Sequence, residues 1–253
     1  MKITRTIAEA RAALPDGQVG LVPTMGAYHA GHLALFAAAR EENDLVVASL
    51  FVNPAQFGDP ADIARYPRDE AADAAIAEEA GIDVLFAPPA DELYPAGYET
   101  WVDVTVASRG LEGAYRPGHF RGVATICLKL FNIVRPRRAY FGQKDAQQVE
   151  VVRRMIRDLN LDVELRVLPT VRDPDGLALS SRNALLTDGE RSVALALPRA
   201  LATRDVALAR ELLQGLDVDY VEVAPFDPPT LAAAVRVGSV RLIDNVPLEG
   251  GPA

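Results

Sequence analysis

The fold is decided in the stretch QVGLVPTMGAYHAGH, which spans residues 18–32. Its first part, Gln18–Pro23, is a short apolar run of strand length, and a turn separates it from an Ala- and Leu-rich segment, His32–Arg40, with helical periodicity. A second apolar run, Leu45–Val52, follows closely. Because this run is continuous, it is typical of a strand that is covered on both faces.

The alternation of strand-like and helix-like segments continues to about residue 170. The sequence predicts helices over Thr4–Leu14, Asp69–Ala80, Val123–Val134 and Ala146–Leu159. It predicts β-rich segments over Asp83–Ala87, Trp101–Val106, Ala139–Phe141 and Val163–Val167. This alternation predicts an α/β fold with a Rossmann-like, doubly wound parallel sheet, which binds ligands at the carboxyl ends of its strands.

The pattern changes after about residue 170. A long helical stretch, Asp188–Leu213, is interrupted at Pro198 and leads to two short β-rich runs, Asp219–Val223 and Ser239–Ile243. We therefore expect two domains, a Rossmann-like catalytic domain over residues 1–170 and a smaller C-terminal α+β domain over residues 171–253.

Composition narrows the class of protein. The chain has 253 residues, of which 49% are hydrophobic and 24% charged, so a globular protein is expected. No 18 apolar residues run together and no signal peptide is recognisable, which predicts a protein without a membrane span. The single cysteine, Cys127, cannot form an internal disulfide and fits a reducing, cytoplasmic location.

Charge is distributed unevenly along the chain. The formal net charge of −9 argues against nucleic acid or a membrane surface as partner. Residues 116–154 nevertheless carry nine basic and only two acidic side chains. Such a segment could concentrate small anions such as phosphates or carboxylates, or it could be an ordinary set of solvated helix faces. Charge alone leaves both interpretations open.

Two of the three histidines, His29 and His32, fall on one predicted strand-to-helix turn. The His-x-Gly-His spacing places both imidazoles within one helical turn, and Gly31 allows a ligand to approach the backbone closely. Imidazole N–H groups beside a helix N-terminus can donate to a phosphate and stabilise charge that develops during group transfer. The alternatives are a zinc site, for which the chain offers few ligands, and two simply packed side chains.

Two further polar stretches follow predicted strands. Asn53 and Gln56 are neutral hydrogen-bonding residues suited to a hydroxyl or carboxylate, although capping of the loop is an equal alternative. Lys144 stands at a predicted helix start after Gly142, where it can reach a phosphate, while Asp145 can accept from ribose hydroxyls.

A fourth polar stretch, Ser180-Ser181-Arg182-Asn183, lies in a predicted loop. Two hydroxyls and a guanidinium suit a phosphate clamp, and a plain loop with a helix cap is the alternative. The usual P-loop and dinucleotide-binding glycine fingerprints do not occur in the sequence.

Taken in order, these stretches resemble the pantoate–β-alanine ligase (pantothenate synthetase) family of the His-x-Gly-His nucleotidyltransferase superfamily. The resemblance is carried by Pro23–His32, Ser49–Phe57, Tyr66–Arg68, Arg116–Val123, Lys129–Val134, Phe141–Gln148, Gly176–Asn183 and Arg241–Asn245. It covers most of the chain in the right order. The His-x-Gly-His motif alone would be weaker, because many adenylyltransferases and tRNA synthetases share it.

The resemblance implies an enzyme of the coenzyme A pathway that joins pantoate to β-alanine with ATP and Mg²⁺. The reaction would pass through an enzyme-bound pantoyl adenylate and release pyrophosphate and then AMP. The resemblance also implies a cytoplasmic homodimer that associates through its N-terminal domain, and a C-terminal domain that acts as a lid.

Family positions imply roles for individual residues. The catalytic set implied is His29, His32, Lys144, Ser180, Ser181 and Arg182. Pantoate would be bound by Met25, Asn53, Gln56 and Gln148. ATP would be bound by Pro23, Thr24, Met25, Gly26, His29, Gly31, His32, Gly142, Lys144, Asp145, Val171, Ser180, Ser181 and Arg182. Asp73 matches a position associated with Mg²⁺, although by itself it resembles a surface helix residue.

The chain departs from the family pattern in three places. Tyr28 stands where an aliphatic residue is usual, Ala184-Leu185-Leu186 replaces a bulkier segment, and the stretch from Asn183 to Tyr220 is shorter. Two other functions are the alternatives: another adenylyltransferase of the superfamily, and a non-catalytic nucleotide-binding regulator. Glutamines at 56 and 148 argue against a phosphate acceptor, which would call for Arg or Lys.

Overall fold

The computed structural model describes residues 1–14, 17–58, 63–64 and 66–248, and the chain divides into two compact units. The first unit contains Met1–Tyr28, His32–Phe141 and Gln148–Leu168. The second contains His29–Gly31, Gly142–Gln147 and Pro169–Ala253. The second unit is thus mainly the C-terminal stretch, and two short segments from earlier in the chain belong to it as well.

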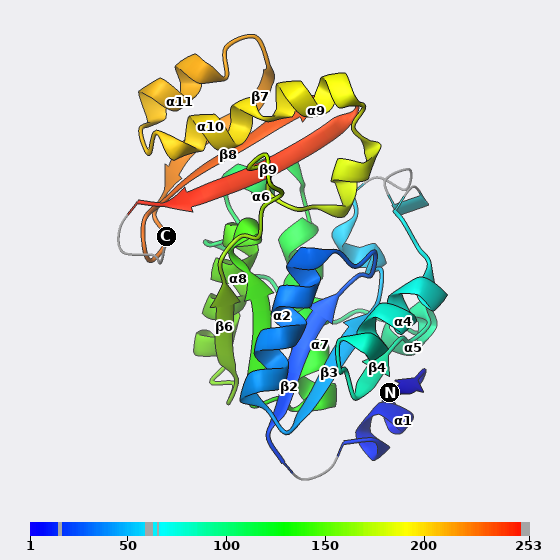
Figure 1. Cartoon of the computed structure of the whole chain (residues 1–253). Helices are drawn as coiled ribbons and strands as arrows, with labels where there is room; N and C mark the ends of the chain where they lie inside the picture. The colour runs from blue at the N-terminus through cyan, green and yellow to red at the C-terminus, as the bar shows by residue number, and fades with distance from the viewer. Residues whose placement is uncertain (15–16, 59–62, 65, 249–253) are drawn as a thin grey trace. The chain divides into compact units, whose positions relative to one another are not determined.

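The first unit is built on a six-stranded sheet (Figure 1). Its strands are β1 (Lys2–Thr4), β2 (Val19–Thr24), β3 (Leu45–Leu50), β4 (Val84–Phe86), β5 (Arg138–Gly142) and β6 (Glu164–Leu168). Their order is β1-β4-β3-β2-β5-β6, and the pairings of β1 with β4, β4 with β3, and β2 with both β3 and β5 are parallel. The direction of winding reverses between β2 and β5, which is where such sheets bind ligands.

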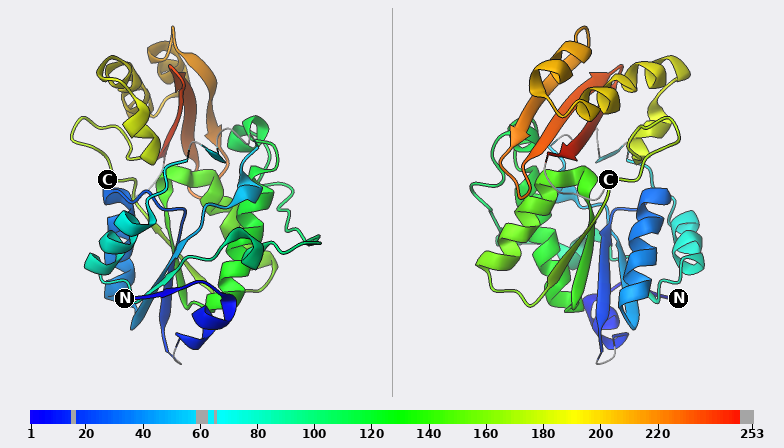
Figure 2. Two further views of the ribbon diagram at one scale, coloured as in Figure 1. Left: turned by 90° about the vertical axis from the view of Figure 1, so that its right-hand side faces the viewer. Right: turned by 60° about the vertical axis from the view of Figure 1, so that its left-hand side comes forward.

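Helices cover both faces of this sheet, as Figure 2 shows. One face packs against α1 (Ile7–Ala12), α7 (His119–Val134) and α8 (Ala146–Asp158), and the other against α2 (Ala30–Glu42) and α4 (Glu70–Glu79). Successive strand residues point to opposite faces, so Leu21 joins the first core and Val22 the second. The fold predicted from the sequence, a doubly wound parallel sheet of the Rossmann type, is confirmed.

Short elements complete the first unit. They are the 3₁₀ turn η1 (Pro54–Gln56) and the helices α5 (Ala90–Leu93) and α6 (Leu111–Tyr115). The turn η1 follows β3 and packs against α7. It therefore places polar residues just beyond the carboxyl end of a central strand.

The second unit is an α+β structure, as predicted. Its antiparallel sheet joins β7 (Asp217–Ala224), β8 (Thr230–Val237) and β9 (Val240–Pro247) in that order. The helices α9 (Asp188–Ala194), α10 (Ala196–Ala202) and α11 (Val206–Leu212) share one hydrophobic core with the sheet, in which Leu197, Leu201 and Leu231 are fully buried. The turns η2 (Gln143–Asp145) and η3 (Ser181–Leu185) also belong to this unit.

Some local predictions were wrong. The β-rich segment Trp101–Val106 forms no strand; its backbone N–H at Val102 donates to Thr125 Oγ1 at 3.0 Å, and the Trp101 ring stacks on Tyr94. The first helix begins at Ile7 rather than Thr4, because Thr4 ends β1 and Thr6 caps the helix in a capping box with Glu9.

The C-terminal elements also differ in detail. Pro198 does not interrupt the helical stretch: it lies in the first turn of α10, where a missing N–H costs nothing. The breaks fall at Leu195 and at Thr203–Asp205 instead. The strand β8, with the sequence TLAAAVRV, had no counterpart among the predictions, because its alanines obscured the strand pattern.

Within the part of the chain that the structure describes, no helix combines the length and apolar character that crossing a membrane requires.

The hydrophobic cores on both faces of the six-stranded sheet predict how much stability is lost when one buried side chain is shortened. Leu85 on β4 is fully buried, so Leu85→Ala should lower the free energy of unfolding by about 2–5 kcal/mol through the cavity it leaves. Urea titration followed by circular dichroism measures this. Leu159→Ala, at a side chain that is 47% exposed, serves as the control and should cost less than about 1 kcal/mol. Equal losses for both variants would contradict the assigned core.

Candidate functional site

The turn after β2 is held by one carboxylate. Asp73, buried on α4, accepts hydrogen bonds from the backbone N–H groups of Ala27 and Tyr28, each at 2.9 Å. Gly26, with φ of 85°, leaves room for this contact, because a Cβ there would lie 2.5 Å from Asp73 Oδ2. The conformation of residues 25–28 therefore depends on Asp73.

These contacts bear on the Mg²⁺ role that the resemblance implies for Asp73. Each carboxylate oxygen accepts one backbone N–H bond, so Asp73 has a structural role in this turn that does not depend on a metal. Among the described residues, no group of three or more His, Cys, Asp and Glu could hold a metal ion. The described part of the chain therefore holds no ready-made cluster of protein ligands for Mg²⁺, and the Mg²⁺ role of Asp73 stays a prediction.

A chain of buried amides follows β3. Asn53 caps η1 through Oδ1, which accepts from Ala55 N and from Tyr94 Oη, and its Nδ2 donates to Gln56 Oε1 at 2.9 Å. Gln56 Nε2 in turn donates to the sulfur of Met25 at 3.2 Å. The structure thus brings together three of the residues predicted to bind pantoate, and the capping role considered for Asn53 is also present.

Two residues of α7 that the predicted site did not include support this amide chain. Gly122 O accepts from Asn53 Nδ2 at 3.1 Å, and a Cβ at Gly122 would lie 2.3 Å from Ala55 O. His119 Nδ1 lies 2.9 Å from Gln56 O, which can only accept, so Nδ1 carries the proton. Both residues could have been noticed in the sequence, because His119 begins an otherwise apolar helix and Gly122 lies inside it.

The other residues predicted for the first unit lie on β2, α2 and α8. Thr24 Oγ1 bonds the backbone oxygen of Ser49, and Pro23 pairs with Ser49 across β2 and β3. His32 and Tyr28 form a tilted ring pair with centroids 5.3 Å apart. The Tyr28 ring packs edge-on against buried Phe36, and burial raises the pKa of Tyr28. Gln148 is half-buried on α8.

His29 belongs to the second unit, together with Gly31. The Gly31 N–H donates to His29 Nδ1 at 3.1 Å, which makes Nδ1 the acceptor and leaves the proton on Nε2. Burial lowers the pKa of His29, and the nearby Lys144 charge lowers it further. His29 is therefore a neutral imidazole with its donor on Nε2, suited to a phosphate oxygen.

Lys144 lies in η2, directly after β5. Its ammonium is 3.6 Å from the Asp145 carboxylate, and its side chain is only 20% exposed. Gly142 precedes the turn as its N-cap and offers no side chain for capping. The turn accordingly depends on contacts from elsewhere in the unit.

A short hairpin leads to the serine pair. Leu179 N donates to Val171 O and Asp173 N to Leu177 O, and Arg172 and Ala178 form a β-bridge. Ser180 then caps η3 by accepting from Arg182 N, and Asn183 Nδ2 donates to Ala178 O. The loop predicted around Ser180–Asn183 is thus a capped 3₁₀ turn at the base of a hairpin.

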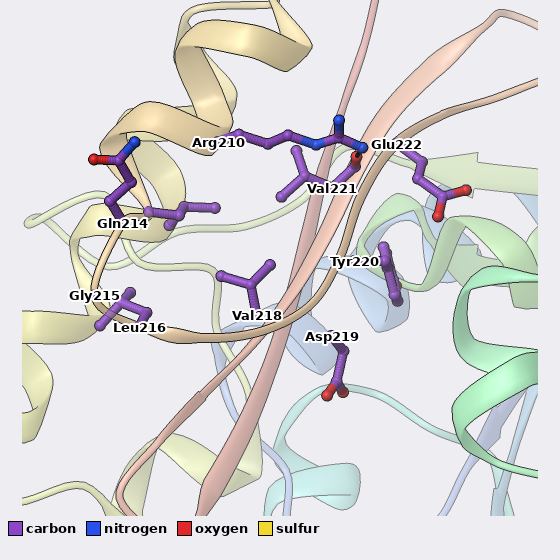
Figure 3. Close-up of a pocket in the computed structure, with 10 residues that line it drawn as sticks. Arg210, Gln214, Gly215, Leu216, Val218, Asp219, Tyr220, Val221 and Glu222 are labelled. Atoms are coloured by element: carbon purple, nitrogen blue, oxygen red, sulfur yellow. Dashed lines mark hydrogen bonds between the residues drawn. The ribbon is translucent and has the colours of Figure 1, made fainter.

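The predicted site residues divide between the two units. The first unit contains Pro23, Thr24, Met25, Gly26, His32, Asn53, Gln56, Asp73 and Gln148. The second contains His29, Gly31, Gly142, Lys144, Asp145, Val171, Ser180, Ser181 and Arg182. A separate pocket beside α11 and β7, with Arg210 and Tyr220 among its lining residues, contains none of them (Figure 3).

Comparison with known sequences gives full-length matches. A family model described as Pantoate-beta-alanine ligase matches residues 2–247. The pantothenate synthetase of Moorella thermoacetica is 49% identical over 280 aligned residues, covering 98% of this chain and 99% of that protein. That of Chloroflexus aurantiacus is 51% identical over 278, covering 99% of each. Both alignments are longer than the 253 residues of this chain, so these relatives carry insertions that it lacks.

Solved structures agree with these sequences. A crystal structure of pantothenate synthetase from Thermus thermophilus superposes with a TM-score of 0.94 at 46% identity, covering 99% of this chain and 100% of that one. The pantoate-beta-alanine ligase of Francisella tularensis, complexed with beta-gamma ATP and beta-alanine, superposes with a TM-score of 0.89 at 35% identity and covers both chains fully.

The contacts of Asp73 predict a structural effect that needs no metal. In Asp73→Asn, an amide NH₂ would face one of the two backbone N–H groups, so stability should fall by about 1–3 kcal/mol even with EDTA present. Thermal unfolding measures this, with Glu79→Gln on the exposed end of α4 as the control. Destabilisation that occurs only when Mg²⁺ is added would favour the metal role instead.

The environment of His29 predicts its titration. Its pKa should lie below the ordinary value of 6.5, as NMR of the imidazole signals across pH would measure, with His29→Gln used for assignment. Because the folded pKa is lowered, the contribution of His29 to stability is complete above pH 6.5 and is lost as the pH falls. Lys144→Met removes a nearby cation and should raise the pKa; an unchanged value would contradict the assigned cause.

Proposed function

Because the chain belongs to the pantoate-beta-alanine ligase family, we propose that it condenses pantoate with β-alanine to pantothenate through an enzyme-bound pantoyl adenylate. ATP would be cleaved to pyrophosphate in the first step, and AMP would leave in the second. The homologue from Francisella tularensis was solved with beta-gamma ATP and beta-alanine, which supports ATP and β-alanine as substrates here.

The observation that carries this proposal is the chain of hydrogen bonds from Asn53 through Gln56 to the sulfur of Met25. These groups are neutral and lie beyond the end of a central strand, where a hydroxy acid can be bound by hydrogen bonds. An adenylyltransferase acting on a phosphate acceptor would need cationic side chains there. The neutral lining supports a hydroxy acid such as pantoate as the acceptor, with Gln148 as a further contact.

In the first step, a carboxylate oxygen of pantoate attacks the α-phosphorus of ATP. The new P–O bond forms as the bond to the bridging oxygen breaks, and pyrophosphate leaves with the electron pair. Negative charge develops on the phosphoryl oxygens, where the Lys144 ammonium and the Nε2–H of neutral His29 would stabilise it. His32, Ser180, Ser181 and Arg182 would contribute further donors to the phosphates.

In the second step, the β-alanine amine attacks the acyl carbonyl of the pantoyl adenylate. A C–N bond forms, the acyl–phosphate bond breaks, and AMP leaves while the nitrogen loses a proton to solvent. Holding both reactants in the correct geometry can contribute ~7–11 kcal/mol, so positioning suffices for most of this step. Exclusion of water would protect the mixed anhydride from hydrolysis.

Partners and the metal follow from the same family membership. We propose that Mg²⁺ enters with the ATP phosphates, because Mg²⁺ is usually bound through substrate phosphates and few protein ligands. We also propose that the protein is a homodimer and acts in the cytoplasm. Analytical ultracentrifugation of the purified chain would test its oligomeric state.

The two-step reaction has a direct test. Purified protein is mixed with ATP, Mg²⁺ and pantoate, and pyrophosphate and AMP are followed with and without β-alanine. We expect about one equivalent of pyrophosphate without β-alanine, and turnover to AMP and pantothenate after its addition. Turnover with another acceptor and none with pantoate would favour a different adenylyltransferase, and ATP binding without chemistry would favour a regulator.

Lys144 should be needed for the first step. A well-placed cation in phosphoryl transfer is worth ~10³–10⁵ in rate, so Lys144→Ala should slow pantoate-dependent pyrophosphate–ATP exchange at least ~10³-fold. Arg137→Ala removes an exposed cation from the same basic segment and should leave the exchange rate unchanged. A loss of less than ~10-fold in Lys144→Ala would remove Lys144 from this role.

A further inference from the structure

Two consecutive polar residues on β9, Asp244 and Asn245, are almost completely buried, with 2% and 4% of their surface exposed. Polar side chains are buried at this level when they make specific hydrogen bonds. Neither residue has a role in the chemistry described above. Their contacts lead to two of the three segments of the second unit that carry proposed phosphate-binding residues, the turn with Lys144 and the hairpin before Ser180.

Asn245 holds the turn that carries Lys144. Its Nδ2 donates to the backbone oxygens of Gln143, at 3.0 Å, and of Lys144, at 2.8 Å. These two carbonyls belong to the peptide planes on either side of the Lys144 Cα. A single side-chain amide therefore restrains both dihedral angles of Lys144 and, with them, the direction in which its side chain leaves the backbone.

The orientation of this amide is itself determined. Gln143 Nε2 donates to Asn245 Oδ1 at 3.2 Å, so the oxygen of the amide faces Gln143 and the NH₂ group faces the two carbonyls. The backbone N–H of Asn245 donates to Asp244 Oδ1 at 2.8 Å. The turn η2 has no side-chain cap on its N–H groups, and Asn245 restrains it through its carbonyl groups.

Asp244 links the same strand to the serine-bearing segment. Its carboxylate forms a two-point ion pair with Arg172, with distances of 2.6 and 3.0 Å. Arg172 also donates to Gly176 O and so braces the hairpin that leads to Ser180. One strand of the C-terminal sheet thus anchors both the Lys144 turn and this hairpin.

We propose that Asn245 is a positioning residue for adenylyl transfer: it acts through Lys144, by holding the backbone of the turn so that the ammonium meets the ATP phosphates. This inference rests on the proposed function, in which Lys144 stabilises the phosphoryl group. It assigns Asn245 no contact with substrate.

The test uses the full-length chain and pyrophosphate–ATP exchange, which reports the first step alone. A misplacement of about 1 Å in a catalytic group can cost ~10²-fold, so Asn245→Ala should lower kcat of exchange ~10–100-fold while KM for pantoate changes less than ~3-fold. Asn245→Asp, which places a carboxylate oxygen against the two carbonyls, should lower kcat of exchange at least as much. Gln143→Ala removes the donor that fixes the Asn245 amide and should lower kcat of exchange ~3–10-fold. This variant replaces Asn245→Ala in the test if Asn245→Ala does not fold.

Asn43 provides the matched control. It is also a buried amide, and its Nδ2 also makes two donated bonds, to Ala39 O and Tyr140 Oη, but it belongs to the first unit. Asn43→Ala should lower the thermal unfolding midpoint by an amount similar to that in Asn245→Ala and leave kcat of exchange within ~3-fold. Equal losses of kcat in both variants would show that general destabilisation is responsible and would overturn the proposal.

A double-mutant cycle separates positioning from an independent effect. If Asn245 acts through Lys144, Asn245→Ala should change the exchange rate less than ~3-fold in the Lys144→Ala background. The same large factor in both backgrounds would overturn the proposal. An active wild-type chain whose kcat is unchanged by Asn245→Ala would also overturn it and leave the proposed function intact. A wild-type chain without pantoate-dependent exchange would overturn both.

Discussion

Strand β2 and its parallel pairing on both edges are the constraint on which the rest of the structure depends. β2 pairs with β3 on one side and β5 on the other, and its alternating residues, including Leu21 and Val22, enter two different cores. A shift of one residue would exchange these faces, so the register is strongly determined. Because the winding reverses beside β2, the chain that leaves its carboxyl end at Met25 enters the region where parallel sheets bind ligands.

Buried polar side chains then give the loops at these strand ends defined conformations. Asp73 holds the turn after β2, Asn53 holds η1 after β3, and Asn245 holds η2 after β5. In each case a side chain from the same unit forms hydrogen bonds with backbone groups of the loop. Loops of this kind provide preorganised donors and acceptors, which the proposed reaction of a carboxylate with a triphosphate would require.

The candidate site could be predicted in part because its chemistry is local in sequence. His29 and His32, and Lys144 with its neighbours, stand on strand–turn–helix segments that the hydrophobic pattern locates. The support for these residues was harder to predict, since Gly122 and Asn245 act through contacts with residues distant in sequence. The strand β8 was missed because its alanines carry little β-pattern, whereas pairing with β7 and β9 decides its conformation.

The sequence by itself determined the alternation of strands and helices, the α/β class and the positions of the polar turns, because hydrophobic periodicity and turn residues act over a few neighbours. It also carried the resemblance to the ligase family. Only the tertiary structure decided that Asp73 bonds the backbone at Ala27 and Tyr28, that Trp101–Val106 is not a strand, and that Asn245 restrains Lys144. These depend on which buried donor meets which acceptor, and burial is a property of the folded chain.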